Sequence, residues 1–150
     1  MFASLLWVML STTASSQDRA VAVEVIVSPL LADLALDRGF LRAVFTMRMR
    51  QWPDGSPVRV FVLPDDNPLS DRFYREQLGM YTYVLRNGWD RMVFTGTGLA
   101  PTVVQSEQEM SERVRSTPGA IGFVRKREST QFQTGVPDLR IVHLVTHAHD

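Results

Sequence analysis

The chain has 150 residues, 45% hydrophobic and 21% charged, a composition typical of one globular domain. Sixteen basic residues balance sixteen acidic ones, which excludes a general electrostatic attraction to nucleic acid or to anionic membranes. The absence of cysteine excludes disulfides, thiolate metal sites and a lipoprotein anchor.

The first 16 residues are typical of a secretory signal peptide. Phe2 to Leu10 is apolar but too short to span a bilayer, and Ala14 and Ser16 supply small residues for cleavage. No Lys or Arg precedes the apolar run, so an ordinary buried N-terminal segment is the alternative. We expect a signal peptide over residues 1–16, one domain over residues 17–150, and a periplasmic protein, since disulfides are optional in that compartment.

The segment before residue 64 predicts an alternation of strands and helices. A β-branched run predicts a strand buried on both faces, and a serine followed by proline predicts a helix start. The alternation of valines with other residues predicts a second strand. The expected elements are a strand at Val21–Val27, a helix from Ser28 to Ala35, a helical stripe from Leu41 to Phe45, a turn at Trp52–Gly55 and a strand at Val58–Leu63.

The rest of the chain continues the alternation. The expected elements are a helix containing Phe73, Tyr74 and Leu78 that ends at Gly79, a helix from Tyr81 to Arg91, a helix begun by the capping box Ser106–Glu109, strands at Thr102–Val104, Ala120–Val124 and Leu139–Val145, and a polar loop from Arg125 to Gly135. Strands separated by capped helices indicate an α/β fold with a mostly parallel sheet flanked by helices. In such sheets ligands bind where strands end and helices begin.

Three stretches resemble the phosphate-type periplasmic solute-binding proteins of ABC transporters. They are Phe45 to Gly55, Trp89 to Gly98 with Pro101, and Pro118 to Val124. The resemblance covers about Val21 to Val124. It implies the type II periplasmic-binding-protein fold, in which two α/β lobes close on an anion, and the chain length suits a short member with one complete lobe.

The first candidate binding segment is the loop and helix start from Asn67 to Arg72. A helix N-terminus favours anions, and Ser70 and Arg72 add a hydroxyl and a guanidinium. In the resembled family this segment carries an Arg, an Asp and a Ser-Gly-Thr run before a Phe; Phe73 matches, but the Arg and the Ser-Gly-Thr run are missing. The alternative is ordinary capping, with Arg72 paired to Glu76 at i,i+4 spacing.

The second candidate is Thr95, Gly96, Thr97 and Gly98. Two glycines and two hydroxyls predict a backbone nest for an oxyanion. The alternative is a structural turn after the preceding helix, because the spacing matches no complete nucleotide-binding loop.

Two further groups of residues carry weaker signals. Trp52 and Trp89 are either ligand platforms or, as we favour, core anchors. The potential metal ligands at the C-terminus are His143, His147, His149 and Asp150. Since chain ends fray, we expect no metal site there.

No catalytic triad, carboxylate pair or cofactor fingerprint is visible, so we expect a non-enzyme without cofactors. The resemblance implies a periplasmic phosphate- or oxyanion-binding protein of the ABC-transporter substrate-binding type, or a degenerate descendant of one. Its partners would be an ABC permease or another envelope protein, and it would have no membrane span after signal cleavage. The alternative is a non-transport envelope interaction or sensor module that keeps the fold without binding a ligand.

Overall fold

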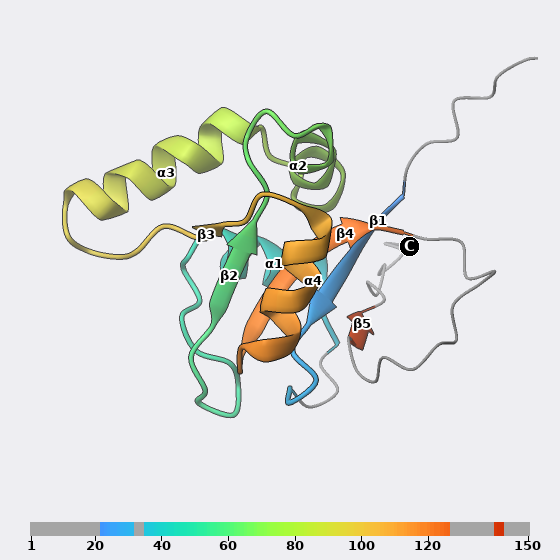
Figure 1. Cartoon of the computed structure of the whole chain (residues 1–150). Helices are drawn as coiled ribbons and strands as arrows, with labels where there is room; N and C mark the ends of the chain where they lie inside the picture. Colours follow the sequence, from blue (N-terminus) through green and yellow to red (C-terminus); the bar gives the residue numbers. More distant parts are fainter. Residues whose placement is uncertain (1–21, 32–34, 127–139, 143–150) are drawn as a thin grey trace, which may run out of the picture.

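The computed structural model describes residues 22–31, 35–126 and 140–142 (Figure 1). The expected signal peptide, the C-terminal histidines, most of the polar loop and both ends of the last expected strand lie outside these residues. The elements are β1 (Val23–Val27), α1 (Arg38–Phe45), β2 (Arg59–Val62), α2 (Pro68–Phe73), the π-helical turn η1 (Tyr74–Leu78), α3 (Thr82–Phe94), β3 (Thr102–Val103), α4 (Glu107–Ser116), β4 (Ala120–Arg125) and β5 (Arg140–Val142).

The described strands form one sheet in the order β3-β2-β4-β1-β5. β2 is parallel to β3 and β4, whereas β1 is antiparallel to both of its neighbours, β4 and β5. The α/β class is confirmed, but the sheet is mixed: among the described strands, β1 alone runs against the others. A β-branched run indicates burial on both faces of a sheet, and such burial is compatible with either strand direction.

α1 begins at Asp37, whose Oδ1 accepts a hydrogen bond from the Phe40 N–H at 2.6 Å. The helix expected to start at Ser28 is wrong in its described part, because Ser28 opens a turn in which the Leu31 N–H donates to the Ser28 carbonyl at 3.1 Å. Ala35 also lies outside any helix. Serine followed by proline suits the first two positions of a turn as well as a helix start, so local sequence does not separate the two.

The other expected elements are confirmed within the described residues, with changed ends. The helix containing Phe73 continues as η1 and stops at Gly79, which has a φ of 63°. α3 extends past Arg91 to Phe94. The turn at Trp52 is closed by the Gly55 N–H, which donates to the Trp52 carbonyl at 2.8 Å.

Two helical layers cover the two faces of the sheet, as neighbouring residues of β4 show. A Cβ on Gly122 would lie 2.4 Å from the Met110 sulfur, so this side of β4 packs directly against α4. The next residue, Phe123, points to the opposite face and stacks on Phe73 of α2, with ring centroids 4.2 Å apart. Figure 1 shows α4 in front of the sheet and α1 behind it.

Both tryptophans of the described residues are core anchors, as favoured from the sequence. Trp89 is 1% exposed and its Nε1 donates to the Phe45 carbonyl at 2.9 Å. Trp52 is 3% exposed and its Nε1 donates to the Gly119 carbonyl at 2.9 Å. Each indole therefore buries its ring and satisfies its one donor.

Gly119 provides a test of the packing around Trp52. Gly119 and Gly96 both have positive φ, 72° and 68°, but only at Gly119 would a Cβ clash, 2.2 Å from the Pro57 carbonyl oxygen. Both Gly→Ala substitutions carry the left-handed cost of about 1–2 kcal/mol. We expect Gly119→Ala to lose about 1–3 kcal/mol more than Gly96→Ala in urea unfolding; equal losses would contradict the clash.

Candidate functional site

A polar cluster lies beside the edge where β2 ends. It consists of Asp65 from the loop after β2, Ser70 of α2, Tyr74 at the start of η1, and Arg86 of α3. Ser70 and Tyr74 are four residues apart on continuous helical backbone and therefore share one face. The cluster joins three consecutive helical elements at the strand end where ligands bind in open α/β sheets.

The Asp65–Arg86 ion pair uses only one carboxylate oxygen. Arg86 Nε and Nη2 lie 2.7 Å and 2.6 Å from Asp65 Oδ2. Asp65 Oδ1 is buried and has no hydrogen-bond partner. The side chains of Arg86 and Asp65 are 38% and 34% exposed, so they form the solvent-facing end of the polar cluster.

The two hydroxyls of the polar cluster are buried and lack well-formed hydrogen bonds. Ser70 and Tyr74 are both 0% exposed, and neither Ser70 Oγ nor Tyr74 Oη makes a hydrogen bond of standard geometry, although the two are close enough for the Ser70 hydroxyl to lower the pKa of Tyr74. With Asp65 Oδ1 they make up three of the four such side-chain atoms in the described part of the chain; the fourth is Ser28 Oγ. A buried polar atom without a partner costs about 1–3 kcal/mol, so three together mark a place where an additional polar group would be stabilised.

The polar cluster keeps the Tyr74 phenol protonated. Burial raises the pKa of Tyr74, and the Asp65 carboxylate raises it further, whereas the neighbouring Ser70 hydroxyl and the Arg86 guanidinium lower it. The net pKa lies above the usual value for tyrosine. The phenol is a hydrogen-bond donor at neutral pH, as any tyrosine is, and it keeps its proton to a higher pH than an exposed tyrosine.

The raised pKa of Tyr74 makes stability depend on alkaline pH. An unfolded chain releases the phenolic proton near pH 10, whereas the folded chain retains it to higher pH. The contribution of the protonated Tyr74 phenol to stability is thus fully present below about pH 10, and the free energy of unfolding falls as pH rises above that value. We expect Tyr74→Phe to reduce this fall, and to change stability at neutral pH by no more than about 1 kcal/mol because the hydroxyl has no partner.

Urea unfolding between about pH 8 and pH 11 measures this effect. Tyr83→Phe is the matched control, because Tyr83 is 65% exposed. Equal alkaline behaviour of Tyr74→Phe and the unsubstituted protein would contradict the assignment.

The first turn of α2 has its backbone donors engaged by Asn67. Asn67 Oδ1 accepts from the Leu69 N–H at 2.9 Å, and the Asn67 carbonyl accepts from Ser70 and Asp71 at 2.9 Å and 3.4 Å. Pro68 has no N–H to offer. Recognition of an anion at this segment would therefore depend on side chains.

Arg72 forms the pair that its spacing predicts. Its Nε lies 3.2 Å from Glu76 Oε1, and the two side chains are 34% and 52% exposed. The Arg72–Glu76 pair that the sequence offered as the alternative is therefore present. Arg75 and Asp71 form a second i,i+4 pair, also at 3.2 Å.

The Thr95–Gly98 segment caps the end of α3. The Thr95 and Gly96 N–H groups donate to the Arg91 and Val93 carbonyls, and those of Thr97 and Gly98 both donate to the Met92 carbonyl. The Thr95 and Thr97 hydroxyls lie 2.9 Å apart. These contacts are those of the structural turn, at a helix end whose partial charge is negative.

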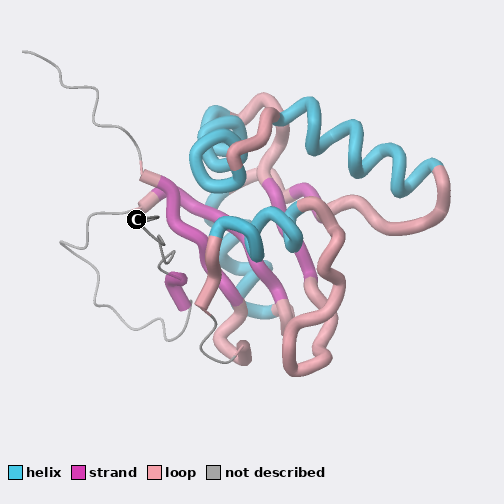
Figure 2. The backbone as a smooth tube through the Cα atoms, turned by 180° about the vertical axis from the view of Figure 1, so that it is seen from behind, coloured by secondary structure: helices cyan, strands magenta, loops and turns pink. Residues whose placement is uncertain are grey.

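The structure does not bring Ser70 and Thr95 together. α3 has 13 residues and is therefore about 20 Å long. In both views its first turn lies near α2, while its last turn is the part farthest from α2 (Figures 1 and 2). The two candidate segments therefore occupy separate places on the molecule.

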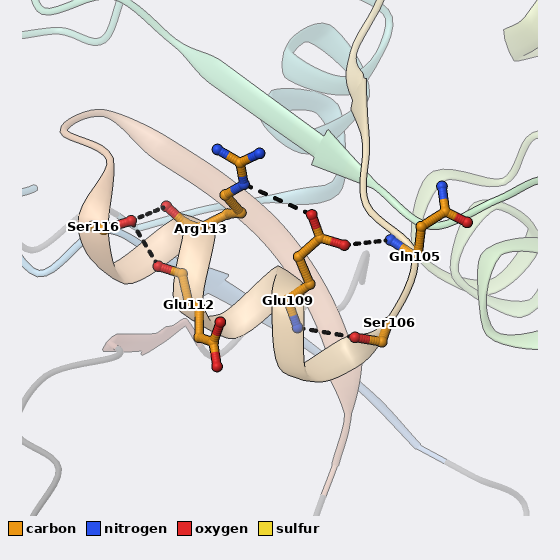
Figure 3. A network of polar contacts seen from close by, with 6 residues as sticks. All are labelled: Gln105, Ser106, Glu109, Glu112, Arg113 and Ser116. Carbon is orange, nitrogen blue, oxygen red and sulfur yellow. Dashed lines mark hydrogen bonds and ion pairs between the residues drawn. The ribbon is translucent and has the colours of Figure 1, made fainter.

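The N-terminus of α4 is satisfied by its own side chains. Ser106 Oγ accepts from the Glu109 N–H at 3.1 Å, while Glu109 Oε2 accepts from the Gln105 N–H at 2.8 Å (Figure 3). The expected capping box is therefore confirmed, with the glutamate reaching one residue further back than usual. Arg113 Nε lies 3.8 Å from Glu109 Oε1, so this network offers an anion little unused charge.

Sequence reasoning named Ser70 but missed its neighbours Asp65, Tyr74 and Arg86 as one site. The i,i+4 spacing of Ser70 and Tyr74 was a usable signal. Nothing in the local sequence indicates that Arg86 belongs to the cluster, because its approach to Asp65 depends on how α3 folds back. Within the described residues no group of three metal-ligating His, Asp or Glu side chains occurs, and none of the described helices has the length and apolarity needed to cross a membrane.

Comparison with known proteins supports the fold. No protein-family model and no curated protein matches the chain. One similar solved structure is PstS from Borrelia burgdorferi, with a TM-score of 0.55 and 15% identity over 70% of this chain and 40% of that one. Another is a putative phosphate ABC transporter substrate-binding protein with bound phosphate from Clostridium perfringens, with a TM-score of 0.56 and 15% identity over 70% of this chain and 40% of that one. A third is an ABC-type phosphate transport receptor from Vibrio cholerae, with a TM-score of 0.57 and 12% identity over 83% of this chain and 46% of that one.

These similarities show the fold alone. The chain has an α/β fold that also occurs in phosphate ABC transporter substrate-binding proteins, and it spans less than half the length of each of the three. Two of the three similar proteins are transport proteins by description, which is consistent with the expectation that this chain is not an enzyme.

Proposed function

We propose that this chain is an oxyanion-binding protein of the ABC-transporter substrate-binding type, with phosphate as the leading ligand. The observation that carries the proposal is the polar cluster. Three buried polar atoms without standard hydrogen bonds belong to the same cluster as Arg86, in a fold shared with phosphate-transport proteins, one of which holds bound phosphate.

The chemistry of the polar cluster suits a protonated oxyanion. The Ser70 and Tyr74 hydroxyls can donate to anionic oxygens, and Arg86 supplies the positive charge. Asp65 Oδ1 can only accept, so it favours an anion that still carries a proton, such as hydrogen phosphate, over a fully deprotonated one such as sulfate. Binding would begin at the solvent-facing end, where Arg86 and Asp65 are partly exposed.

The proposal includes the cellular setting expected from the sequence. Residues 1–16 would direct export, and residues 17–150 would act in the periplasm with an ABC permease or another envelope protein. The Thr95, Gly96 and Thr97 segment remains a separate proposed contact. Its N–H groups are engaged, and its two hydroxyls bond to each other and to the Arg91 carbonyl, so an anion would have to replace existing hydrogen bonds there.

Ser70→Ala tests the ligand site without weakening the fold. The Ser70 hydroxyl has no partner, so its removal should leave the melting temperature unchanged or raise it. We expect calorimetry to detect phosphate binding by the unsubstituted protein, weaker or absent sulfate binding, and loss of phosphate binding in Ser70→Ala. Ser111→Ala is the matched control, because Ser111 is a partly buried helical serine whose hydroxyl donates to the Glu107 carbonyl.

Two results would reject oxyanion binding at the polar cluster. One is the absence of both heat and thermal shift with phosphate up to the millimolar range. The other is phosphate binding of equal strength in Ser70→Ala and the unsubstituted protein.

Arg72→Ala tests whether the second predicted side chain belongs to the ligand site. The ion pair with Glu76 is worth about 0.2–0.5 kcal/mol at such exposure. We expect Arg72→Ala to lose about that much stability and to keep its phosphate response, as should Arg75→Ala at the neighbouring pair. Loss of binding in Arg72→Ala alone would place this guanidinium in the ligand site.

The alternative is an envelope interaction or sensor module that keeps the fold without a ligand. The observation that favours it is the engagement of backbone donors in both segments named from the sequence, at α2 and after α3. Recovery of a stable protein partner from cell envelopes, with no anion binding in calorimetry, would favour the module. Neighbouring permease and ATPase genes would favour uptake.

A further inference from the structure

The apolar surface of the described residues is concentrated on one segment. Seven of the eight large hydrophobic side chains exposed there lie between residues 81 and 103. They are Tyr81, Tyr83, Val84, Val93, Phe94, Leu99 and Val103. Phe94 is 92% exposed at the end of α3. So many exposed apolar side chains in one short segment are unusual for a monomer and mark an interaction surface.

α3 presents this surface away from the body of the protein. Both views show it projecting from the rest of the chain (Figures 1 and 2). It makes no extensive contact with another described element. Its buried side chains, Leu85 and Trp89, attach only one face to the core, so the opposite face is open to a partner.

The open face of α3 is complementary to itself. Tyr83, Asn87, Asp90 and Phe94 follow i, i+4, i+7, i+11 spacing and form one stripe along the helix. A two-fold axis between residues 88 and 89 exchanges Tyr83 with Phe94 and Asn87 with Asp90. An antiparallel pair of such helices would therefore place an aromatic pair at each end and an amide opposite a carboxylate near the middle.

The polar residues of the stripe match as donor and acceptor as well as in position. The side chains of Asn87 and Asp90 are exposed and have no hydrogen bond or ion pair within the described part of the chain. In the antiparallel arrangement each Asp90 carboxylate meets a neutral amide donor instead of another carboxylate. Self-association thus satisfies the polar residues while it covers the aromatic ones.

We propose that α3 is a homodimer interface, in which the stripe Tyr83, Asn87, Asp90, Phe94 packs antiparallel against the same stripe of a second copy. The interface is one helix wide, so the dimer should be reversible and of micromolar affinity. The inference is independent of anion binding by the polar cluster.

Sedimentation and light scattering of the protein as purified from a bacterial expression host, over a range of concentrations, test the dimer. Phe94→Asp should weaken dimerisation at least about tenfold, because it places a charge against an aromatic ring at the interface. Leu30→Asp is the control: Leu30 is 74% exposed but lies outside α3, so this variant should dimerise normally. Circular dichroism checks that both variants remain folded.

Asn87 provides a second test that is specific to the two-fold pairing. Asn87→Asp sets a carboxylate against Asp90 of the second copy and should weaken the dimer, whereas Asn87→Lys should strengthen it in a salt-dependent way. A monomer at all concentrations would overturn the proposal, as would a dimer insensitive to Phe94→Asp. Equal effects of Asn87→Asp and Asn87→Lys would also overturn it.

Discussion

The stack of Phe73 on Phe123 is the contact on which the rest of the structure depends. With centroids 4.2 Å apart and nearly parallel rings, it fixes α2 on the middle strand of the sheet. Phe45 meets Phe73 edge-on at 4.8 Å, which brings α1 to the same point. Since Ser70 and Tyr74 flank Phe73 on continuous helical backbone, the stack also decides where the hydroxyls of the polar cluster lie. Gly122, on the other side of β4, admits α4 and completes the second layer.

Sequence patterns predicted the elements of this fold better than their arrangement. The capping box at Ser106 and the stop at Gly79 are local, because they depend on hydrogen bonds and dihedral angles within one helix turn. The direction of β1 is not local. It depends on pairing with β4, about a hundred residues later in the chain, in a register that joins Val25 to Phe123. The turn that begins at Ser28 is likewise held by a distant contact: the Ser28 N–H donates to the Ala120 carbonyl, which no local pattern indicates.

The candidate site was predictable only in part, for the same physical reason. Ser70 was named because helix starts favour anions, but Asn67 engages the backbone donors on which that rule depends. Asp65 and Arg86 are 21 residues apart and meet only because α3 returns past α2. The unpartnered hydroxyl of Tyr74 is a property of packing, since it arises from enclosure by neighbouring aromatic rings and helices. Composition can suggest an anion site, whereas the supply of free donors is settled by tertiary structure.

α3 links the two surfaces for which we propose functions. Its inner face carries Arg86, which reaches Asp65 and lies 5.8 Å over the Trp89 ring. Trp89 is in turn fixed by its hydrogen bond to the Phe45 carbonyl. The outer face carries the aromatic stripe with Tyr83 and contributes nothing to the core. Because Arg86 and Trp89 attach the helix through its inner face, a partner can bind the outer face without displacing a core side chain. The inner and outer faces therefore belong to one helix, which is attached to the core by the Trp89 indole near its centre.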